Sequence, residues 1–189
     1  MSEDFYDLPK HSTIRNYIIP GLTSHLIGDW SDPTKERLRM FEMEIPQLTM
    51  IVPHSHRYDF HCRVVAGIVT NILWKEVTDP KSDGIDMALS HLTYGGIPGQ
   101  YEKRSIGLTR YTVVSSTYPA GATYCMKSDE IHSIVFCEGA KVLFWEGPQI
   151  SNTTSILEPY VPEYGAVPLF KTEPWMFVHP NQHTLGELE

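Results

Sequence analysis

The feature that most constrains the fold is a series of short runs rich in valine, isoleucine, threonine and aromatic residues. Glycine, proline, aspartate or asparagine separates most of them. The runs cover residues 38–52, 63–77, 108–121, 122–126, 132–139 and 141–148. Valine, isoleucine, threonine and aromatic residues favour strands, whereas glycine, proline, aspartate and asparagine favour turns. The sequence therefore predicts an all-β fold, either a sandwich or a barrel.

Three segments have a different pattern. In "DPTKERLRMFEM", residues 32–43, Asp32 can cap a helical turn with Pro33 at its first position. The segment of residues 78–107 is long and rich in glycine, which predicts a hairpin or a lid between strands. The chain after Ser151 has scattered prolines and aromatics, which predicts a C-terminal arm on the outside of a barrel or on a neighbouring subunit.

Composition and charge narrow the class of partner. A length of 189 residues with 41% hydrophobic and 20% charged residues fits one soluble domain. A net charge of -8 without a run of basic residues argues against nucleic acid and anionic membranes, so we expect a small-molecule partner. No window reaches the ~18 apolar residues of a membrane helix, and the first residues are acidic and polar, so we expect a cytoplasmic protein.

The three cysteines carry no C-x-x-C spacing. Their odd number fits reduced thiols better than a disulfide framework or a structural zinc site. We expect Cys62, Cys125 and Cys137 to be small core residues.

The stretch "IVPHSHRYDFHCRVVAGIVTNILW", residues 51–74, places many polar groups in a strand-like run. Side chains of a strand alternate between its two faces. One face then carries His54, His56, Tyr58, Phe60, Cys62 and Val64, and the other carries Arg57, Asp59, His61 and Arg63. Two imidazoles that point into a barrel form half of a metal site. The alternative is that His54 and His56 are surface histidines near the end of a strand, because Pro53 favours a strand start or an edge strand.

A second segment, "STYPAGATYCMKSDEIHSIVFCEG", has a turn at Pro119 to Gly121 and a strand that opens at His132. Together the two segments resemble the cupin superfamily, whose motifs are G-x5-H-x-H-x3-4-E-x6-G and G-x5-P-x-G-x2-H-x3-N. The matching positions are His54, His56 and Gly67 in the first motif and Pro119, Gly121 and His132 in the second. His132 comes later than the second motif places its histidine.

The cupin resemblance covers residues 40–148 and implies a cupin-like jelly-roll β-barrel. The whole chain, residues 1–189, would be a single domain, with N-terminal and C-terminal extensions packed on a core of about residues 40–148 and a long insertion between the motifs. The resemblance also implies a divalent metal held by His54, His56 and His132, and a homodimer.

The chain departs from the first cupin motif where a ligating glutamate is usual. It has Phe60 or His61 there, depending on the spacer. A flat strand leaves three histidines and no carboxylate, whereas a β-bulge near Asp59 would turn His61 inward as a fourth ligand. The glycine and the asparagine of the second motif are also absent from their usual places.

A three-histidine cupin site is similar to that of the thiol dioxygenases, which implies Fe(II), although imidazole also suits Zn and Ni, and Mn is a further candidate. The tyrosine and histidine of that family's last core strand are replaced by Trp145 and Glu146, which argues against cysteine oxidation. The 2-oxoglutarate oxygenases need a carboxylate where this chain has His56, which argues against membership of that class.

Other side chains are candidates for contact with a ligand. Tyr58 shares the inward face and either donates a hydrogen bond to a ligand or fills the core. Arg57 reaches the site only if the strand twists at its start, and Tyr124 can line the cavity. Asp129 and Glu130 adjoin His132 and are candidates to orient its imidazole.

Two functional classes follow. The first is a metal-dependent small-molecule enzyme, with oxygenase chemistry ahead of metal-assisted hydrolase, lyase or isomerase chemistry. The second is a barrel that sequesters or senses a small ligand without turnover, because no pair of side chains stands out as an acid/base couple. Jelly-roll barrels host both classes, so the fold does not decide between them.

Overall fold

Two antiparallel sheets of six strands each make up the part of the chain that the computed structural model describes, residues 10–27, 36–79, 81–95, 100–161 and 165–166. The first sheet has, in order, β1 (Lys10–Ile14), β2 (Leu22–Ile27), β3 (Arg37–Met43), β10 (Lys141–Glu146), β4 (Phe60–Ala66) and β8 (Thr123–Met126). The second has β12 (Gly165–Ala166), β11 (Thr153–Val161), β6 (Ile85–Tyr94), β7 (Tyr101–Pro119), β5 (Ile68–Glu76) and β9 (Ile131–Phe136).

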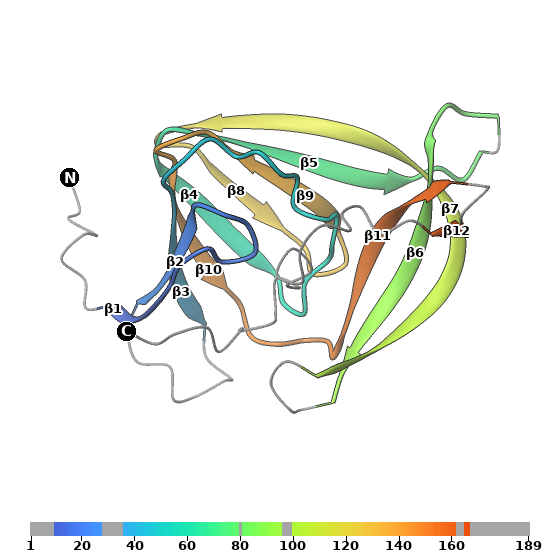
Figure 1. The fold of residues 1–189 in the computed structure, drawn as a ribbon, viewed down its shortest axis with the longest axis horizontal. Helices are drawn as coiled ribbons and strands as arrows, with labels where there is room; N and C mark the ends of the chain where they lie inside the picture. The colour runs from blue at the N-terminus through green and yellow to red at the C-terminus, as the bar shows by residue number, and fades with distance from the viewer. Residues whose placement is uncertain (1–9, 28–35, 80, 96–99, 162–164, 167–189) are drawn as a thin grey trace.

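The chain crosses repeatedly between the two sheets. From β7 to β11, each strand lies in the opposite sheet to the strand before it, and β10 lies between β3 and β4. Figure 1 shows the two sheets joined at one side and spread apart at the other, where β6, β7 and β11 extend beyond the first sheet. The described residues contain no helix, and their two antiparallel sheets confirm the expected all-β jelly roll.

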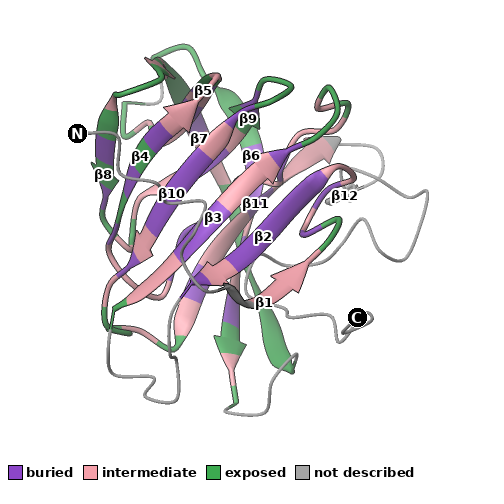
Figure 2. Cartoon of the chain, turned by 90° about the vertical axis from the view of Figure 1, so that its left-hand side faces the viewer, coloured by how far each residue is buried: buried purple, intermediate pink, exposed green. Residues whose placement is uncertain are grey.

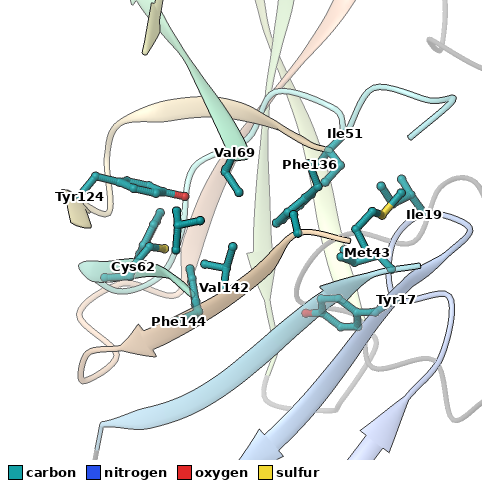
Figure 3. Close-up of a cluster of buried hydrophobic side chains, with 14 of the residues drawn as sticks. Tyr17, Ile19, Met43, Ile51, Cys62, Val69, Tyr124, Phe136, Val142 and Phe144 are labelled. Atoms are coloured by element: carbon teal, nitrogen blue, oxygen red, sulfur yellow. The ribbon is translucent and has the colours of Figure 1, made fainter. Parts of the chain in front are cut away.

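The main hydrophobic core lies between the facing sheets. In β4 the buried residues Phe60, Cys62 and Val64 alternate with the exposed residues His61 and Arg63, as the sequence predicts. The burial colours in Figure 2 show long buried stretches on β2 and β10 of the same sheet. Figure 3 shows side chains from several strands gathered in this core.

Two of the three unusual segments differ from expectation. The helix expected within residues 32–43 is wrong over 37–43, which form strand β3 between β2 and β10, while Asp32 and Pro33 lie outside the described residues. Burial between two strands outweighs a weak helical start. The arm expected after Ser151 begins as β11, which pairs with β6 in the second sheet; residues 162–164 and 167–189 lie outside the described part.

The long segment between the motifs is a hairpin rather than a lid. Strands β6 and β7 pair from Ile85↔Tyr111 to Tyr94↔Tyr101. Strands β1, β2 and β11 belong to the two sheets although they lie outside residues 40–148. The division of the chain into a core and two extensions stays a prediction.

Gly67 joins β4 to β5 in a backbone conformation that favours glycine, with a φ of 70°. A Cβ at this position would lie 2.8 Å from Ala140 Cα and 2.9 Å from Cys137 Sγ. Both the conformation and the close approach exclude a side chain here. The turn geometry therefore explains why a glycine stands at this position, which matches the end of the first cupin motif.

The cysteines are all free thiols, but only Cys62 is buried. Cys125 and Cys137 are exposed, so the expectation of three core residues is wrong for these two. Cys125 alternates to the outer face of β8, opposite His61 of β4. Among the described residues, no helix is long and apolar enough to cross a membrane.

Candidate metal centre

The histidines of the two motifs meet between the sheets. His54 and His132 form an isolated antiparallel bridge, in which His54 N donates to His132 O at 2.8 Å and His132 N donates to His54 O at 2.9 Å. His56 N donates to Ser128 O at 3.0 Å. These backbone bonds fix the segment before β4, which has no regular strand structure, against the start of β9.

The three imidazoles form a compact cluster. His56 Nε2 lies 2.9 Å from His132 Nε2, and one nitrogen of each of His54, His56 and His132 lies within 4.8 Å of the others. All three residues are at most 6% exposed. Three buried imidazole nitrogens this close together are a donor set that would hold one divalent ion.

Hydrogen bonds at the far side of two rings set their tautomers. His132 Nδ1 donates to Asn71 Oδ1 at 2.6 Å, and His54 Nδ1 donates to Val52 O at 2.7 Å. Each ring therefore keeps its proton on Nδ1 and offers the lone pair of Nε2 to the cluster. Asn71 is itself held by Met126, because Asn71 Nδ2 donates to Met126 Sδ at 3.4 Å.

Burial also sets the protonation of the rings. Desolvation lowers the pKa of His54 to about 4, in spite of the hydrogen bond to Val52 that favours the charged ring. Desolvation, and then the neighbouring His54, lowers the pKa of His132 well below its ordinary value. Both imidazoles are neutral at pH 7, which is the form that binds metal ions. The donor set thus fits a divalent cation.

The cluster opens onto a cavity of about 50 Å³. This volume accommodates a few water molecules or a small ligand. Aromatic and aliphatic side chains make most of its wall. Among its lining residues are Tyr58, Phe60, Cys62, Tyr124, Phe144 and Glu146.

Two of the predicted ligand-contacting residues line this cavity. The ring of Tyr58 lies 5.5 Å from that of His56, and Tyr124 points into the space beside Cys62 and Phe144 in Figure 3. Desolvation, followed by Glu146 for Tyr58 and by Cys62 for Tyr124, raises the pKa of both hydroxyls well above the ordinary value for tyrosine. Both therefore remain protonated hydrogen-bond donors at neutral pH.

The other two predicted residues are not brought to the cluster. His61 is exposed on the outer face of β4 and stacks on Trp145, with ring centroids 4.5 Å apart. Arg57 does not line the cavity, and its guanidinium lies over the ring of Tyr94, 4.7 Å from the centroid. No bulge turns His61 inward, because β4 pairs with β8 in unbroken register from Phe60 to Arg63.

Sequence reasoning missed two polar residues at the site. The orienting role considered for Asp129 and Glu130 belongs to Asn71, while Glu130 Oε2 accepts a hydrogen bond from Lys127 N. Glu146 lines the cavity and pairs with the buried Arg39. Strand alternation could have identified Asn71 and Glu146, because it places each as a polar residue at an inward position, on β5 and on β10.

The fold and the site together show an all-β jelly roll with a three-histidine cluster between its sheets. No family model and no curated protein sequence matches the chain. Among solved structures, hydroxypropylphosphonic acid epoxidase from S. wedmorenis matches with 9% identity and a TM-score of 0.43, over 75% of this chain and 56% of the epoxidase. Oxalate decarboxylase from Lactobacillus farciminis matches with 12% identity and a TM-score of 0.41, over 79% of this chain and 34% of the decarboxylase.

KdgF from Halomonas sp. matches with 12% identity and a TM-score of 0.35, over 67% of this chain and 81% of KdgF. The chain thus spans a little over half of the epoxidase and about a third of the decarboxylase. At these identities and TM-scores, the chemistry of the three proteins does not carry over to this chain. The function has to be inferred from its own residues.

Proposed function

We propose that the protein is a metal-dependent small-molecule enzyme of the oxygenase type, with Fe(II) held by His54, His56 and His132. The observation that supports this most strongly is the convergence of three buried imidazoles in one apolar cavity, two of them with Nε2 lone pairs directed by hydrogen bonds. Fe(II) in such a site supplies electrons and open coordination positions for dioxygen chemistry.

The chain's own residues orient the ligands and exclude water. Asn71 and Val52 hold the rings of His132 and His54 by their Nδ1–H groups. The aromatic wall around the cluster keeps bulk water out, which strengthens electrostatic interactions inside. Tyr58 and Tyr124 offer protonated hydroxyls to a substrate.

Elemental analysis of protein purified without a histidine tag, before and after anaerobic incubation with Fe(II), tests the proposal. His54→Ala and His132→Ala are expected to lose the iron. His61→Ala is the matched control, because this exposed histidine lies on the outer face of β4, the strand that follows His54 and His56 in the sequence. Circular dichroism verifies that each variant is folded.

The outcomes separate the possible chemistries. Near-stoichiometric iron that is lost from the two cavity variants and kept in His61→Ala supports the proposal, and an oxygen-consumption screen with small molecules then follows. Zinc, nickel or manganese bound in the same pattern would move the function to hydrolase, lyase or isomerase chemistry. Folded protein that takes up no metal would overturn the metal centre.

A non-catalytic barrel that sequesters or senses a small ligand is the second candidate. It is favoured by the titratable groups of the cavity wall, since Tyr58 and Tyr124 keep their protons at neutral pH and Glu146 is paired with Arg39. None of these forms an evident acid/base couple. Metal-loaded protein that binds a small molecule without consuming oxygen or converting the ligand would support this second function.

A further inference from the structure

We propose that Glu146 is the ligand-recognition group of the cavity, with its Oε2 accepting a hydrogen bond from the hydroxyl of a small, mostly apolar ligand. This deepens the proposed function and rests on it only in placing the ligand beside the histidines. The hydroxyl acceptor is a feature of the cavity whether or not a metal is bound.

Glu146 occupies an inward position at the end of β10. Val142 and Phe144 precede it on the same face, and all three line the cavity. Glu146 lies directly opposite Phe60 of β4 in the strand register. The ring of Phe60 contacts the rings of His56 and His132, at centroid distances of 4.7 Å and 5.5 Å. The carboxylate and the histidine cluster thus line one cavity.

Only one oxygen of this carboxylate is hydrogen-bonded within the described part of the chain. Arg39 Nε donates to Glu146 Oε1, and Arg39 Nη1 donates to Ser24 Oγ at 3.4 Å. Glu146 Oε2 has Arg37 Nη1 at 4.0 Å, which is an ion pair beyond hydrogen-bond distance. Since an ionised carboxylate can accept about four hydrogen bonds, Oε2 retains acceptor capacity.

Stability alone is a poor reason for this pair. Glu146 and Arg39 are each 4% exposed. Desolvation of two such charges offsets most of their attraction, and apolar replacements of similar volume are often neutral or stabilising. With Phe60 and Phe144 beside it, an apolar residue at position 146 would complete the wall of the cavity. A role in ligand binding explains why a buried carboxylate occupies position 146 of this otherwise apolar wall.

The surroundings define the chemical class of the ligand. Arg39 already balances the charge of Glu146, so the ligand does not need to be a cation. A neutral hydroxyl satisfies Oε2 without adding a charge to a low-dielectric space. The remaining wall is mainly aromatic and aliphatic, and the volume of about 50 Å³ limits the ligand to a few carbon atoms.

Two probes of nearly the same shape test the hydrogen bond. Ethanol donates from its hydroxyl, whereas fluoroethane has no donor, and both are small enough for the cavity. Ligand-observed NMR titrations with the full-length protein, with and without Zn(II), give the two affinities. We expect ethanol to bind at least about tenfold more tightly than fluoroethane, which is typical of a hydrogen bond to a charged group.

The matched variant replaces both partners, Arg39→Met together with Glu146→Leu, so that no unpaired charge remains buried. We expect it to bind the two probes with affinities within about threefold of each other. Equal affinities in the unaltered protein, or no binding of either probe, would overturn the proposal whether or not the variant folds. Selectivity retained by the folded double variant would also overturn it.

Zinc content of the same samples distinguishes the two levels of the hypothesis. Loss of probe selectivity in the variant with zinc still bound supports the role of Glu146 independently of the chemistry at the metal. Protein that binds no zinc overturns the metal centre, and the comparison of the probes on metal-free protein still tests Glu146.

Discussion

His56 Nε2 lies 2.9 Å from His132 Nε2, although 76 positions separate the two residues in the sequence. Local structure cannot produce this contact. It depends on the bridge between His54 and His132, and on a second bridge between His54 and Ile156 of β11. The segment before β4 is thus fixed to strands of the second sheet, and the cluster forms between the two sheets.

Asn71 is expected to control metal affinity through His132. Asn71→Leu removes the acceptor of the Nδ1–H bond, and we expect Zn(II) or Co(II) to bind about 10–100-fold more weakly. Asn71→Asp keeps an acceptor and should retain affinity within about tenfold of the original. Competition with a chromophoric chelator measures the affinity, and the visible spectrum of the Co(II) protein reports ligand geometry.

Thr70→Val is the control for the Asn71 variants, because Thr70 is the preceding residue and bonds Thr117 at an exposed position. It should leave metal affinity unchanged. If Asn71→Leu bound Co(II) as tightly as the original chain and with the same spectrum, the orienting role of Asn71 would be wrong.

Asp59 is expected to stabilise the turn that supports His56. Asp59 Oδ1 accepts from Ser128 N at 2.8 Å and Oδ2 accepts from Lys127 Nζ at 2.7 Å, while Ser128 O accepts from His56 N. The Lys127 side chain, and then the Ser128 backbone, lowers the pKa of Asp59 below its ordinary 3.8. The stabilisation is therefore present above pH 3.8 and lost as the pH falls through the lower folded pKa.

Urea unfolding between about pH 2.5 and 6 tests this linkage. The original chain should be more stable than Asp59→Asn at the upper end of this range, and the difference should shrink as the pH falls. The gap should be small and reduced further by 1 M salt, because both partners are exposed and screened. A difference that is constant with pH would contradict the role of the Asp59 charge.

Gly67 and Gly139 provide a matched pair for the crowding at the β4–β5 turn. Both have positive φ, 70° and 75°, but only a Cβ at Gly67 would meet other atoms. Gly139→Ala should lower the free energy of unfolding by about 1–2 kcal/mol, from backbone conformation alone. Gly67→Ala should lower it by at least about 1 kcal/mol more. Equal losses in denaturant titrations would show that Ala140 yields without cost.

The sequence predicts features that depend on short-range alternation. The burial of Phe60, Cys62 and Val64 against the exposure of His61 follows from one strand read residue by residue. The same alternation put His54 and His56 on one side, and this holds although the segment that carries them is not a regular strand. Short-range geometry was sufficient because the two histidines are only two residues apart.

The partners of the site depend on strand register, which the local sequence does not encode. Asn71 reaches His132 because β5 and β9 pair with Leu73 opposite His132. Arg39 reaches Glu146 because β3 and β10 pair with Arg39 opposite Phe144. A shift of one residue would reverse the face of each side chain. The orienting amide and the buried ion pair could therefore be located only in the folded chain.

Cys62 should be the protected thiol of the three. Burial raises its pKa to about 12, so almost no thiolate is present at pH 8. Cys125 and Cys137 are exposed. Iodoacetamide at pH 8 should therefore add two groups to the native protein and three after denaturation, as counted by mass spectrometry with peptide mapping. Modification of Cys62 as fast as Cys125 in the folded protein would mean that the cavity wall opens on the time scale of labelling, which would contradict the water-excluding role assigned to it.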